Sequence, residues 1–395
     1  MTVEIAAART RPATPIAFSP PSITEEEIAA VVEVLRSGWI TTGPKTREFE
    51  EAFADYIGAE AALAVNSCTA AMHIGLAALG IGPGDEVIST PMTFASTIHV
   101  IEQVGARPVL VDIDPQTLNI DPDRVAQAIT PRTKAIMPVH YAGHPVEMGP
   151  LLALAQEHGL YILEDAAHAL PAAYRGQMVG TIGDLTAFSF YVTKNMTTAE
   201  GGMLTGSPEL IERARVLSLH GMSRDAWKRY KVGGSWYYEV VAAGFKYNIT
   251  DIQSALGLVQ LARLDSMQAR RRHVVSRYNA AFSGWDALQT PAERPHVDHA
   301  WHLYVLRLNL DALTIDRARF IDELTARNIG SSVHFIPVHV HPYYRDKYGW
   351  EPEDFPVAWR EYQRVVSLPL HPQLSDADIT AVIEAVTDIV ATFGR

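Results

Sequence analysis

The chain has 395 residues, of which 48% are hydrophobic and 20% are charged. This composition is typical of a globular protein with two or three domains. Asp and Glu total 45 against 33 Lys and Arg, a formal net charge of -12, and a field of that sign repels nucleic acids and anionic membranes. We therefore expect neither as a partner.

Two further features indicate the compartment. Residues 1–18 lack the long apolar core of a signal peptide, and no apolar run reaches the roughly 18 residues of a membrane-spanning helix. Cys68 is the only cysteine, which excludes an intramolecular disulfide and a cysteine-based zinc site. These features predict a cytoplasmic protein.

Short, unbroken apolar runs predict strands that are buried on both faces of a sheet. They lie at residues 86–90, 108–113, 134–139, 160–165, 185–190 and 201–206. Residues 95–105 and 148–159 have a helical pattern, and each segment ends at a glycine that suits a helix C-cap. This alternation predicts an α/β fold with a mostly parallel sheet.

The pattern changes after about residue 264. A basic helical segment, a strand-like run and a further helix follow, and the last segment begins with a Ser-x-x-Asp capping signal. They occupy residues 268–282, 299–310, 316–330 and 375–393. We expect a large domain of residues 20–264 and a smaller C-terminal α+β domain of residues 265–395. No low-complexity linker separates them, so they should pack closely.

Polar residues follow the predicted strands, where open α/β sheets bind ligands. Residues 67–70, "SCTA", open an Ala-rich helix whose N–H groups and dipole suit a phosphate; an ordinary helix N-cap is the alternative. Asp165 ends a strand and can hydrogen-bond a protonated pyridine nitrogen, and His168 follows it. A helix-capping aspartate and a structural histidine are the alternatives.

Lys194 lies between the apolar run "FSF" and the polar segment "TTAEGG". A buried charged lysine is unfavourable, so such a lysine is paired, reaches solvent or acts as a nucleophilic amine. A phosphate-binding helix start, a strand-end aspartate and a lysine are the three protein groups that a pyridoxal 5'-phosphate site needs. Their order along the chain favours a lysine that binds this cofactor covalently.

The chain resembles the DegT/DnrJ/EryC1/StrS sugar aminotransferases from about Pro20 onward. The motifs that carry the resemblance are "GPKTREFEEAFADYIG", "NSCTAAMHIGLAALGIGPGDEVIST", "PVHYAGHP", "EDAAHA", "FSFYVTKNMTTAEGG", "GFKYNITDIQSALGLVQLARLD" and "VHFIPVHVHPYY". The resemblance implies fold type I of the pyridoxal-phosphate enzymes, in which helices flank a mostly parallel seven-stranded sheet beside a smaller C-terminal α+β domain. Within the family, "LHGMSRDAW", "GFKYN" and "HAWHLYVLRL" are similar to members that form a 4-amino-4-deoxy sugar nucleotide.

The resemblance also implies residue roles. The catalytic residues would be Lys194, which binds the cofactor, Asp165, which faces the pyridine nitrogen, and His168, near the ring hydroxyl. The other cofactor contacts would be made by the phosphate-binding turn, a phosphate-binding serine, a ring-stacking aromatic side chain and an asparagine from the partner subunit of a homodimer. These are Thr69 and Ala70, Ser189, Phe94 and Asn248.

The implied reaction moves an amino group from glutamate to a nucleotide-linked ketosugar, with a 4-keto sugar expected. The alternatives are another keto position, a cyclitol acceptor, a sugar dehydratase of the family, in which histidine replaces the lysine, and a non-catalytic scaffold. Arg229 and His334 are the expected substrate-binding residues. Because both substrates are anionic, the basic segment 224–231 is a candidate for binding them, with a solvated loop as the alternative.

Two further interpretations concern the histidines of "VHFIPVHVH" and Cys68. His334, His339 and His341 suggest a metal cluster, but no acidic ligand lies in the segment. A sugar or nucleotide wall fits these histidines better, and we expect no metal. Cys68 could be a desulfurase-like nucleophile. It lies in the expected phosphate turn, however, which favours a small packing residue.

Overall fold

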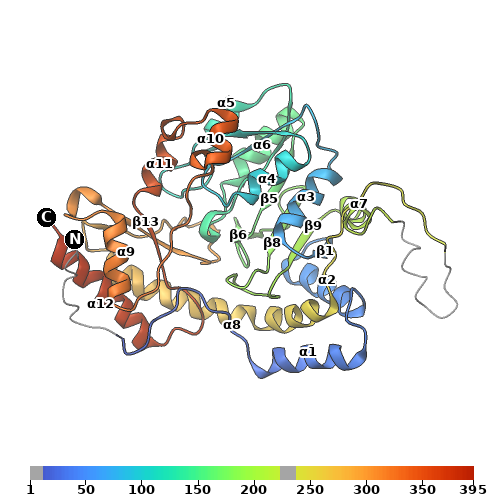
Figure 1. Cartoon of the computed structure of the whole chain (residues 1–395). Coiled ribbons are helices and arrows are strands. Elements are labelled where there is room, and N and C mark those ends of the chain that lie inside the picture. Colours follow the sequence, from blue (N-terminus) through green and yellow to red (C-terminus); the bar gives the residue numbers. More distant parts are fainter. Residues whose placement is uncertain (1–11, 223–236) are drawn as a thin grey trace.

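The computed structural model describes residues 12–222 and 237–395. Its centre is a seven-stranded sheet between two layers of helices (Figure 1). The strands are β1 (Ala61–Val65), β2 (Glu86–Ser89), β3 (Arg107–Leu110), β4 (Thr133–Ile136), β5 (Tyr161–Asp165), β8 (Leu185–Ser189) and β9 (Gly202–Gly206). Their order in the sheet is β1-β9-β8-β5-β4-β2-β3, and β9 is antiparallel to both of its neighbours. The mostly parallel seven-stranded sheet expected from the family resemblance is confirmed.

Each strand directs alternate side chains to opposite faces of the sheet. One face packs against α3 (Cys68–Ala78), α4 (Ser96–Gln103) and α7 (Pro208–Ser218). The other packs against α2 (Pro44–Ile57), α5 (Pro122–Ala128), α6 (Met148–His158) and part of α8 (Asp251–Phe282). In β5, Leu163 packs on the α3 face and Ile162 on the α6 face. Asp165 therefore belongs to the α3 face and Glu164 to the other.

The C-terminal part has a hydrophobic core of its own. An antiparallel sheet in the order β10-β12-β13 packs there against two helices and the second half of α8. These elements are β10 (Leu288–Gln289), β12 (Tyr304–Leu308), β13 (Val365–Leu368), α9 (Arg317–Ala326) and α12 (Asp376–Phe393). The predicted capping signal is confirmed, since Ser375 and Asp378 form a capping box at the start of α12. The smaller α+β domain expected from the sequence is thus observed.

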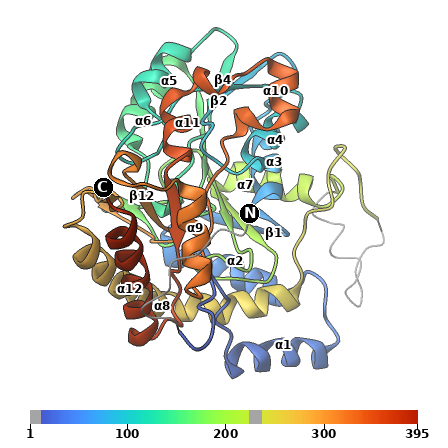
Figure 2. The same ribbon diagram turned by 60° about the vertical axis from the view of Figure 1, so that its left-hand side comes forward.

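Helix α8 connects the two parts. Its 32 residues run without a break through the expected boundary between residues 264 and 265. Figures 1 and 2 show α8 along the lower side of the molecule, with α1 (Glu25–Ser37) packed on it and α12 at its far end. We propose that the domains of residues 20–264 and 265–395 share this helix.

Smaller elements join the two parts elsewhere. A third sheet has the order β11-β6-β7, formed by β11 (Val297–Asp298), β6 (Ala173–Tyr174) and β7 (Gln177–Met178). The Asp112 carboxylate, just after β3, accepts hydrogen bonds from the N–H groups of Val357 and Ala358 in the first turn of α11 (Pro356–Tyr362). This aspartate caps α11 and fixes the segment that follows α10 (Pro342–Tyr348) against the large sheet.

Strand β1 did not appear among the predicted strands. Its sequence "AALAV" is alanine-rich, and alanine has a weak strand preference. The strand forms because five of its residues pair with β9 at the edge of the sheet. The carboxylate of Glu50 also accepts a hydrogen bond from the Ala64 N–H. Among the described residues, no helix is long and apolar enough to cross a membrane.

Candidate active site

Lys194 lies in the loop that follows β8, and its N–H donates to the carbonyl of Tyr191. Burial lowers the pKa of its amine to about 8, and the Cys68 thiol and Asp165 oppose this shift. Its charge in turn lowers the pKa values of His168 and His334. Lys194 thus lies close enough to a carboxylate and two imidazoles to interact with each, and a useful fraction of its amine is neutral near pH 7.

Asp165 ends β5 at the carboxyl edge of the sheet and is 4% exposed. One carboxylate oxygen accepts a 2.7 Å hydrogen bond from the Thr97 hydroxyl, and the other accepts a 3.1 Å bond from the Ala167 N–H. Burial raises the pKa of this carboxyl group, whereas the two hydrogen bonds and the charge of Lys194 lower it. Both oxygens are therefore held in place, and a nearby cation favours the ionised form.

His168 lies between two rings. Its centroid is 4.4 Å from that of His302 and 5.7 Å from that of Phe335, with the Phe335 ring nearly parallel. Burial and the charge of Lys194 lower the pKa of His168 well below its usual value, so the ring is neutral at pH 7. Its Nδ1 is buried and has no hydrogen-bond partner in the described structure. A buried ring nitrogen without a protein partner is available to hydrogen-bond a ligand or a water molecule.

The expected phosphate turn is the first turn of α3. The Ser67 side chain is its N-cap and accepts a 3.0 Å hydrogen bond from the N–H of Ala70. The N-cap alternative is therefore observed, and it preserves a helix N-terminus in which Thr69 is partly exposed. Gly202 approaches closely: an added Cβ would lie 2.6 Å from the main chain of Ser67 and Cys68. This glycine lets the N-terminus of α3 contact β9.

Two other expected cofactor residues lie at exposed edges of this region. Ser189 is the last residue of β8, pairs with Gly202 and accepts a hydrogen bond from the Tyr191 N–H. Phe94 is 64% exposed, and its ring centroid is 6.1 Å from that of Phe335. An exposed phenyl ring on a rigid segment is available to stack on a flat ligand.

Asn248 and His334 are held within their own chain. The amide nitrogen of Asn248 donates to the Thr42 hydroxyl, its oxygen accepts from Lys246, and its backbone bridges to Val65 at the end of β1. His334 Nδ1 lies 2.8 Å from the Ser367 hydroxyl. Burial, and secondarily the charge of Lys194, lower the pKa of His334 to about 4. Arg229, in the basic segment 224–231, and the rest of residues 223–236 lie outside the described residues.

The family model of the DegT/DnrJ/EryC1/StrS aminotransferases matches residues 21–387. The chain belongs to this family. The spore coat polysaccharide biosynthesis protein SpsC of Bacillus subtilis is 54% identical over 375 residues, which cover 94% of this chain and 96% of SpsC. Spr1654 of Streptococcus pneumoniae, provisionally named a sugar aminotransferase, has been solved in a PLP form. It is 38% identical, with a TM-score of 0.90 and coverage of 96% of this chain and 99% of its own.

The PMP form of Spr1654 gives the same TM-score at 39% identity, covering 95% of this chain and 99% of its own. The enzyme class and cofactor expected from the sequence are therefore confirmed: the chain is a pyridoxal-phosphate-dependent sugar aminotransferase. Its fold and family likewise match the expectation.

The side chains of this aminotransferase fit the cofactor. One region of the structure contains four suitable groups. They are the Lys194 amine with its lowered pKa, the buried Asp165 carboxylate, the N-terminus of α3 and the unpartnered Nδ1 of His168. In their chemistry, these groups suit the aldehyde, the pyridine nitrogen, the phosphate and the ring hydroxyl of pyridoxal phosphate. Residues of this chain can thus address each polar group of the cofactor.

Sequence reasoning missed several groups around this site. Thr97, which holds Asp165, lies three residues after Phe94, but only its position on α4 reveals the contact. His302 lies in the segment "HAWHLYVLRL", and its Nδ1 is 3.2 Å from the Asn195 side chain, beside Lys194. Phe335 lies in the histidine-containing segment "VHFIPVHVH". Long-range packing, which no local pattern encodes, brings them together.

Two alternative chemistries gain no support in this aminotransferase. Cys68 is buried, its Sγ lies 3.5 Å from the carbonyl of Ala187, and burial raises its pKa well above the usual value. A protonated thiol is a poor nucleophile, which argues against a desulfurase role. Within residues 12–222 and 237–395, no group of three or more His, Cys, Asp or Glu side chains is arranged to hold a metal ion.

Proposed function

We propose that the enzyme transfers an amino group from glutamate to the keto carbon of a nucleotide-linked sugar, with a 4-keto sugar as acceptor. The observation that carries the proposal is the position of Lys194. Its amine has a pKa of about 8 and interacts with Asp165 and the Cys68 thiol beside the N-terminus of α3. An amine in this position can both bind the cofactor and move protons.

The roles of the side chains follow from their chemistry. Bound pyridoxal phosphate supplies an electron sink for the carbon that loses a proton. Nζ of Lys194 would accept that proton from the substrate carbon and release it to C4' of the cofactor, since an amine held beside the reacting atoms already has the required geometry. Asp165 places a negative charge where a protonated ring nitrogen is stabilised. His168, neutral at pH 7, offers a hydrogen bond without adding a second positive charge.

The remaining cofactor contacts complete the proposal. The N-terminus of α3, with Thr69 and Ala70, and the Ser189 hydroxyl bind the phosphate. Phe94 stacks on the ring. Asn248 reaches the phosphate of the partner subunit in a homodimer. A dianionic phosphate needs several donors, which supports a contribution from a second chain.

The acceptor is inferred from the relatives and from the charge of the site. The name of SpsC refers to spore coat polysaccharide biosynthesis, which supports an amino sugar that is later built into a polysaccharide. Glutamate and a sugar nucleotide are both anionic, whereas the whole chain carries a net charge of -12. Local cations must offset this charge, and we assign that role to Arg229 and its basic neighbours, with His334 in the wall of the sugar site.

Two stages of one experiment test this function. The purified enzyme with bound cofactor is mixed with glutamate, and absorbance follows conversion from the pyridoxal to the pyridoxamine form. Nucleotide ketosugars that differ in keto position are then added, and mass spectrometry detects replacement of the keto oxygen by an amino group.

The outcomes separate the alternatives. Amination of a 4-keto sugar supports the proposal, and amination of another sugar or a cyclitol changes the acceptor. Loss of a hydroxyl group without gain of nitrogen indicates a dehydratase. No reaction with any amino donor, while the cofactor is bound to Lys194, indicates a scaffold and contradicts the proposal.

A further inference from the structure

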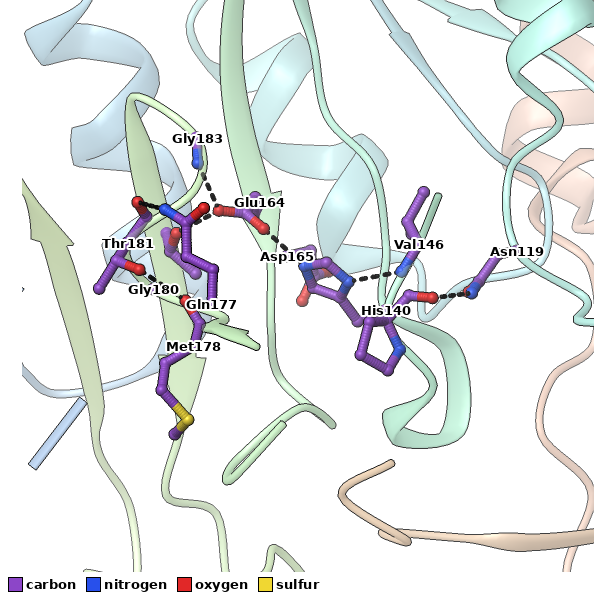
Figure 3. A network of polar contacts seen from close by, with 12 residues as sticks. Asn119, His140, Val146, Glu164, Asp165, Gln177, Met178, Gly180, Thr181 and Gly183 are labelled. Carbon is purple, nitrogen blue, oxygen red and sulfur yellow. Dashed lines mark hydrogen bonds and ion pairs between the residues drawn. The ribbon is translucent and has the colours of Figure 1, made fainter. Parts of the chain in front are cut away.

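A buried hydrogen-bonded pair lies behind Asp165, on the opposite face of the sheet. Nε2 of His140 is 2.9 Å from a carboxylate oxygen of Glu164, and both side chains are fully buried. Figure 3 shows the His140 ring between Glu164 and the backbone of Val146. None of the roles in the proposed reaction uses this pair.

The hydrogen bonds of His140 determine where its proton lies. The Val146 N–H donates to His140 Nδ1 over 3.0 Å, so Nδ1 is an acceptor. The ring proton of a neutral imidazole must then lie on Nε2, from which it is donated to Glu164. Glu164 accepts this bond through a carboxyl oxygen, which an amide nitrogen in the same place cannot do.

The second oxygen of Glu164 binds the neighbouring strand. It accepts a 2.8 Å hydrogen bond from the Gly183 N–H and a 2.7 Å bond from the Thr186 hydroxyl. Thr186 is the partner of Glu164 in the β5–β8 ladder. An added Cβ on Gly183 would lie 3.1 Å from this oxygen and 3.0 Å from atoms of Ile162, which explains the glycine. One carboxylate thus joins β5 to β8 and to the segment that leads from β4.

The same segments hold the backbone of Asp165. The His140 N–H donates to the Asp165 carbonyl over 3.1 Å, and the Asp165 N–H donates to the Pro138 carbonyl over 2.9 Å. These bonds extend the pairing of β4 and β5 beyond the regular strands, with a bridge between Val139 and Asp165. The side chain of His140 therefore fixes the chain that positions the catalytic carboxylate.

We propose that the His140–Glu164 pair is a positioning device that sets the place of Asp165 relative to Lys194. The inference rests on the proposed function, because it assigns the pair to the geometry of that site. The pair acts through the backbone: it ties the carboxyl end of β5 and the segment after β4 to the beginning of β8, the strand that leads to the loop of Lys194. Neither residue needs to contact the cofactor.

The decisive variant is Glu164→Gln. An amide has one accepting oxygen, so whichever way it turns, its NH2 group faces either the His140 Nε2–H or the Gly183 N–H. One bond is lost in either orientation. The matched control is Glu147→Gln, because Glu147 forms a 2.7 Å pair with Nε2 of His296 at a partly exposed position away from the catalytic carboxylate.

Three measurements are made on both variants. The first is the half-reaction with glutamate, which gives a single-turnover rate and a KM for glutamate. The second is the pH at which the absorbance of the bound cofactor changes, and the third is the thermal unfolding temperature without cofactor. A displacement of the order of 1 Å lowers rates by about 100-fold. We therefore expect Glu164→Gln to lose about 100-fold in rate at nearly unchanged KM and to shift the absorbance titration, whereas Glu147→Gln should match the wild type.

A second pair of variants tests the proposal even if Glu164→Gln folds poorly. In His140→Gln, the amide NH2 can replace Nε2–H as the donor to Glu164, whereas His140→Leu removes the donor. If the two variants unfold at similar temperatures, the positioning role predicts a difference between them. The single-turnover rate and the absorbance titration of His140→Gln should then lie closer to the wild type than those of His140→Leu. Rates that follow only the folded fraction, or an unshifted absorbance titration, would overturn the proposal.

The titration separates this proposal from the function itself. It requires neither glutamate nor a sugar, so it can be measured even when the wild type rejects both substrates. A shifted titration in Glu164→Gln with an inactive wild type would contradict the reaction but support the positioning role. An unshifted titration with an active wild type would contradict only the positioning role.

Discussion

The Thr97 hydroxyl donates a 2.7 Å hydrogen bond to Oδ2 of Asp165, and both side chains are buried. Thr97 lies on α4 and Asp165 at the end of β5, so the contact joins a helix to the sheet beneath it. This bond opposes the effect of burial on the carboxylate and lowers its pKa. The charge of Asp165 thus depends on a residue of another element.

Replacing Thr97 should reveal this dependence. Thr97→Val keeps the shape but removes the donor, so the pKa of Asp165 should rise and the acidic limb of the kcat/KM profile should move to higher pH. A hydrogen bond to a charged group contributes about 1.5–3 kcal/mol, equivalent to about a ten- to hundred-fold change. The pH profile of the glutamate half-reaction measures both effects.

The control for Thr97→Val is Thr205→Val. Thr205 is also fully buried, but its hydroxyl donates to the carbonyl of Gly180. This variant should leave the pH profile in place. Equal shifts in the two variants would show that the loss of any buried hydroxyl, rather than the bond to Asp165, changes the profile.

The pKa of Lys194 predicts its reactivity. Because burial lowers this pKa to about 8, the neutral amine should dominate above pH 8, whereas exposed lysines become neutral only near pH 10.4. In the cofactor-free protein, an amine-selective reagent should modify Lys194 half-maximally near pH 8. Peptide mapping across a pH series measures this, and a midpoint close to that of Lys45, a partly exposed lysine whose pKa is raised by Glu48, would contradict it.

Covalent attachment is tested separately. Borohydride reduction of the loaded enzyme should leave a pyridoxyl group on Lys194, and Lys194→Ala should remain folded and keep the cofactor without a covalent bond. Turnover should be abolished, because the residue that moves the proton is gone. A reduced adduct on any other lysine would disprove the assignment.

Gly202 should tolerate no side chain. In Gly202→Ala, the new Cβ would lie 2.6 Å from the main chain of Ser67 and Cys68, so either β9 or the N-terminus of α3 must move. We expect a loss of about 1–3 kcal/mol in stability, together with weaker cofactor binding. Gly284→Ala is the control, since nothing lies within 4 Å of its Cβ. Thermal unfolding and cofactor titration compare them, and unchanged cofactor affinity in Gly202→Ala would separate this contact from the phosphate site.

Mixed dimers test the shared site. Lys194→Ala and Asn248→Asp should each be inactive, the second because a carboxylate facing a phosphate is repulsive. Coexpression should restore about a quarter of the wild-type activity if chains pair at random, since half of the dimers then contain one intact site. If the mixture stays inactive although both variants dimerise and Asn248→Asp alone has lost its cofactor, Asn248 belongs to the site of its own chain.

Local patterns in the sequence determined much of this protein. Apolar runs located six of the seven strands of the large sheet, and the Ser375 and Asp378 signal located the start of α12. The order of the polar segment at 67–70, Asp165 and Lys194 indicated the cofactor. These features are local, because strand burial, helix capping and strand-end side chains depend on residues close together in the chain.

Tertiary structure alone decided how these features meet. β5 pairs with β8 rather than with β6 or β7, the next strands in the chain. This pairing brings the loop of Lys194 beside Asp165. Strand alternation then sends Asp165 toward Thr97 and Glu164 toward His140. The alanine-rich β1 is a strand only because β9 lies next to it. Such contacts join residues far apart in sequence, so their energies arise from packing and pairing in the folded chain, which no local pattern contains.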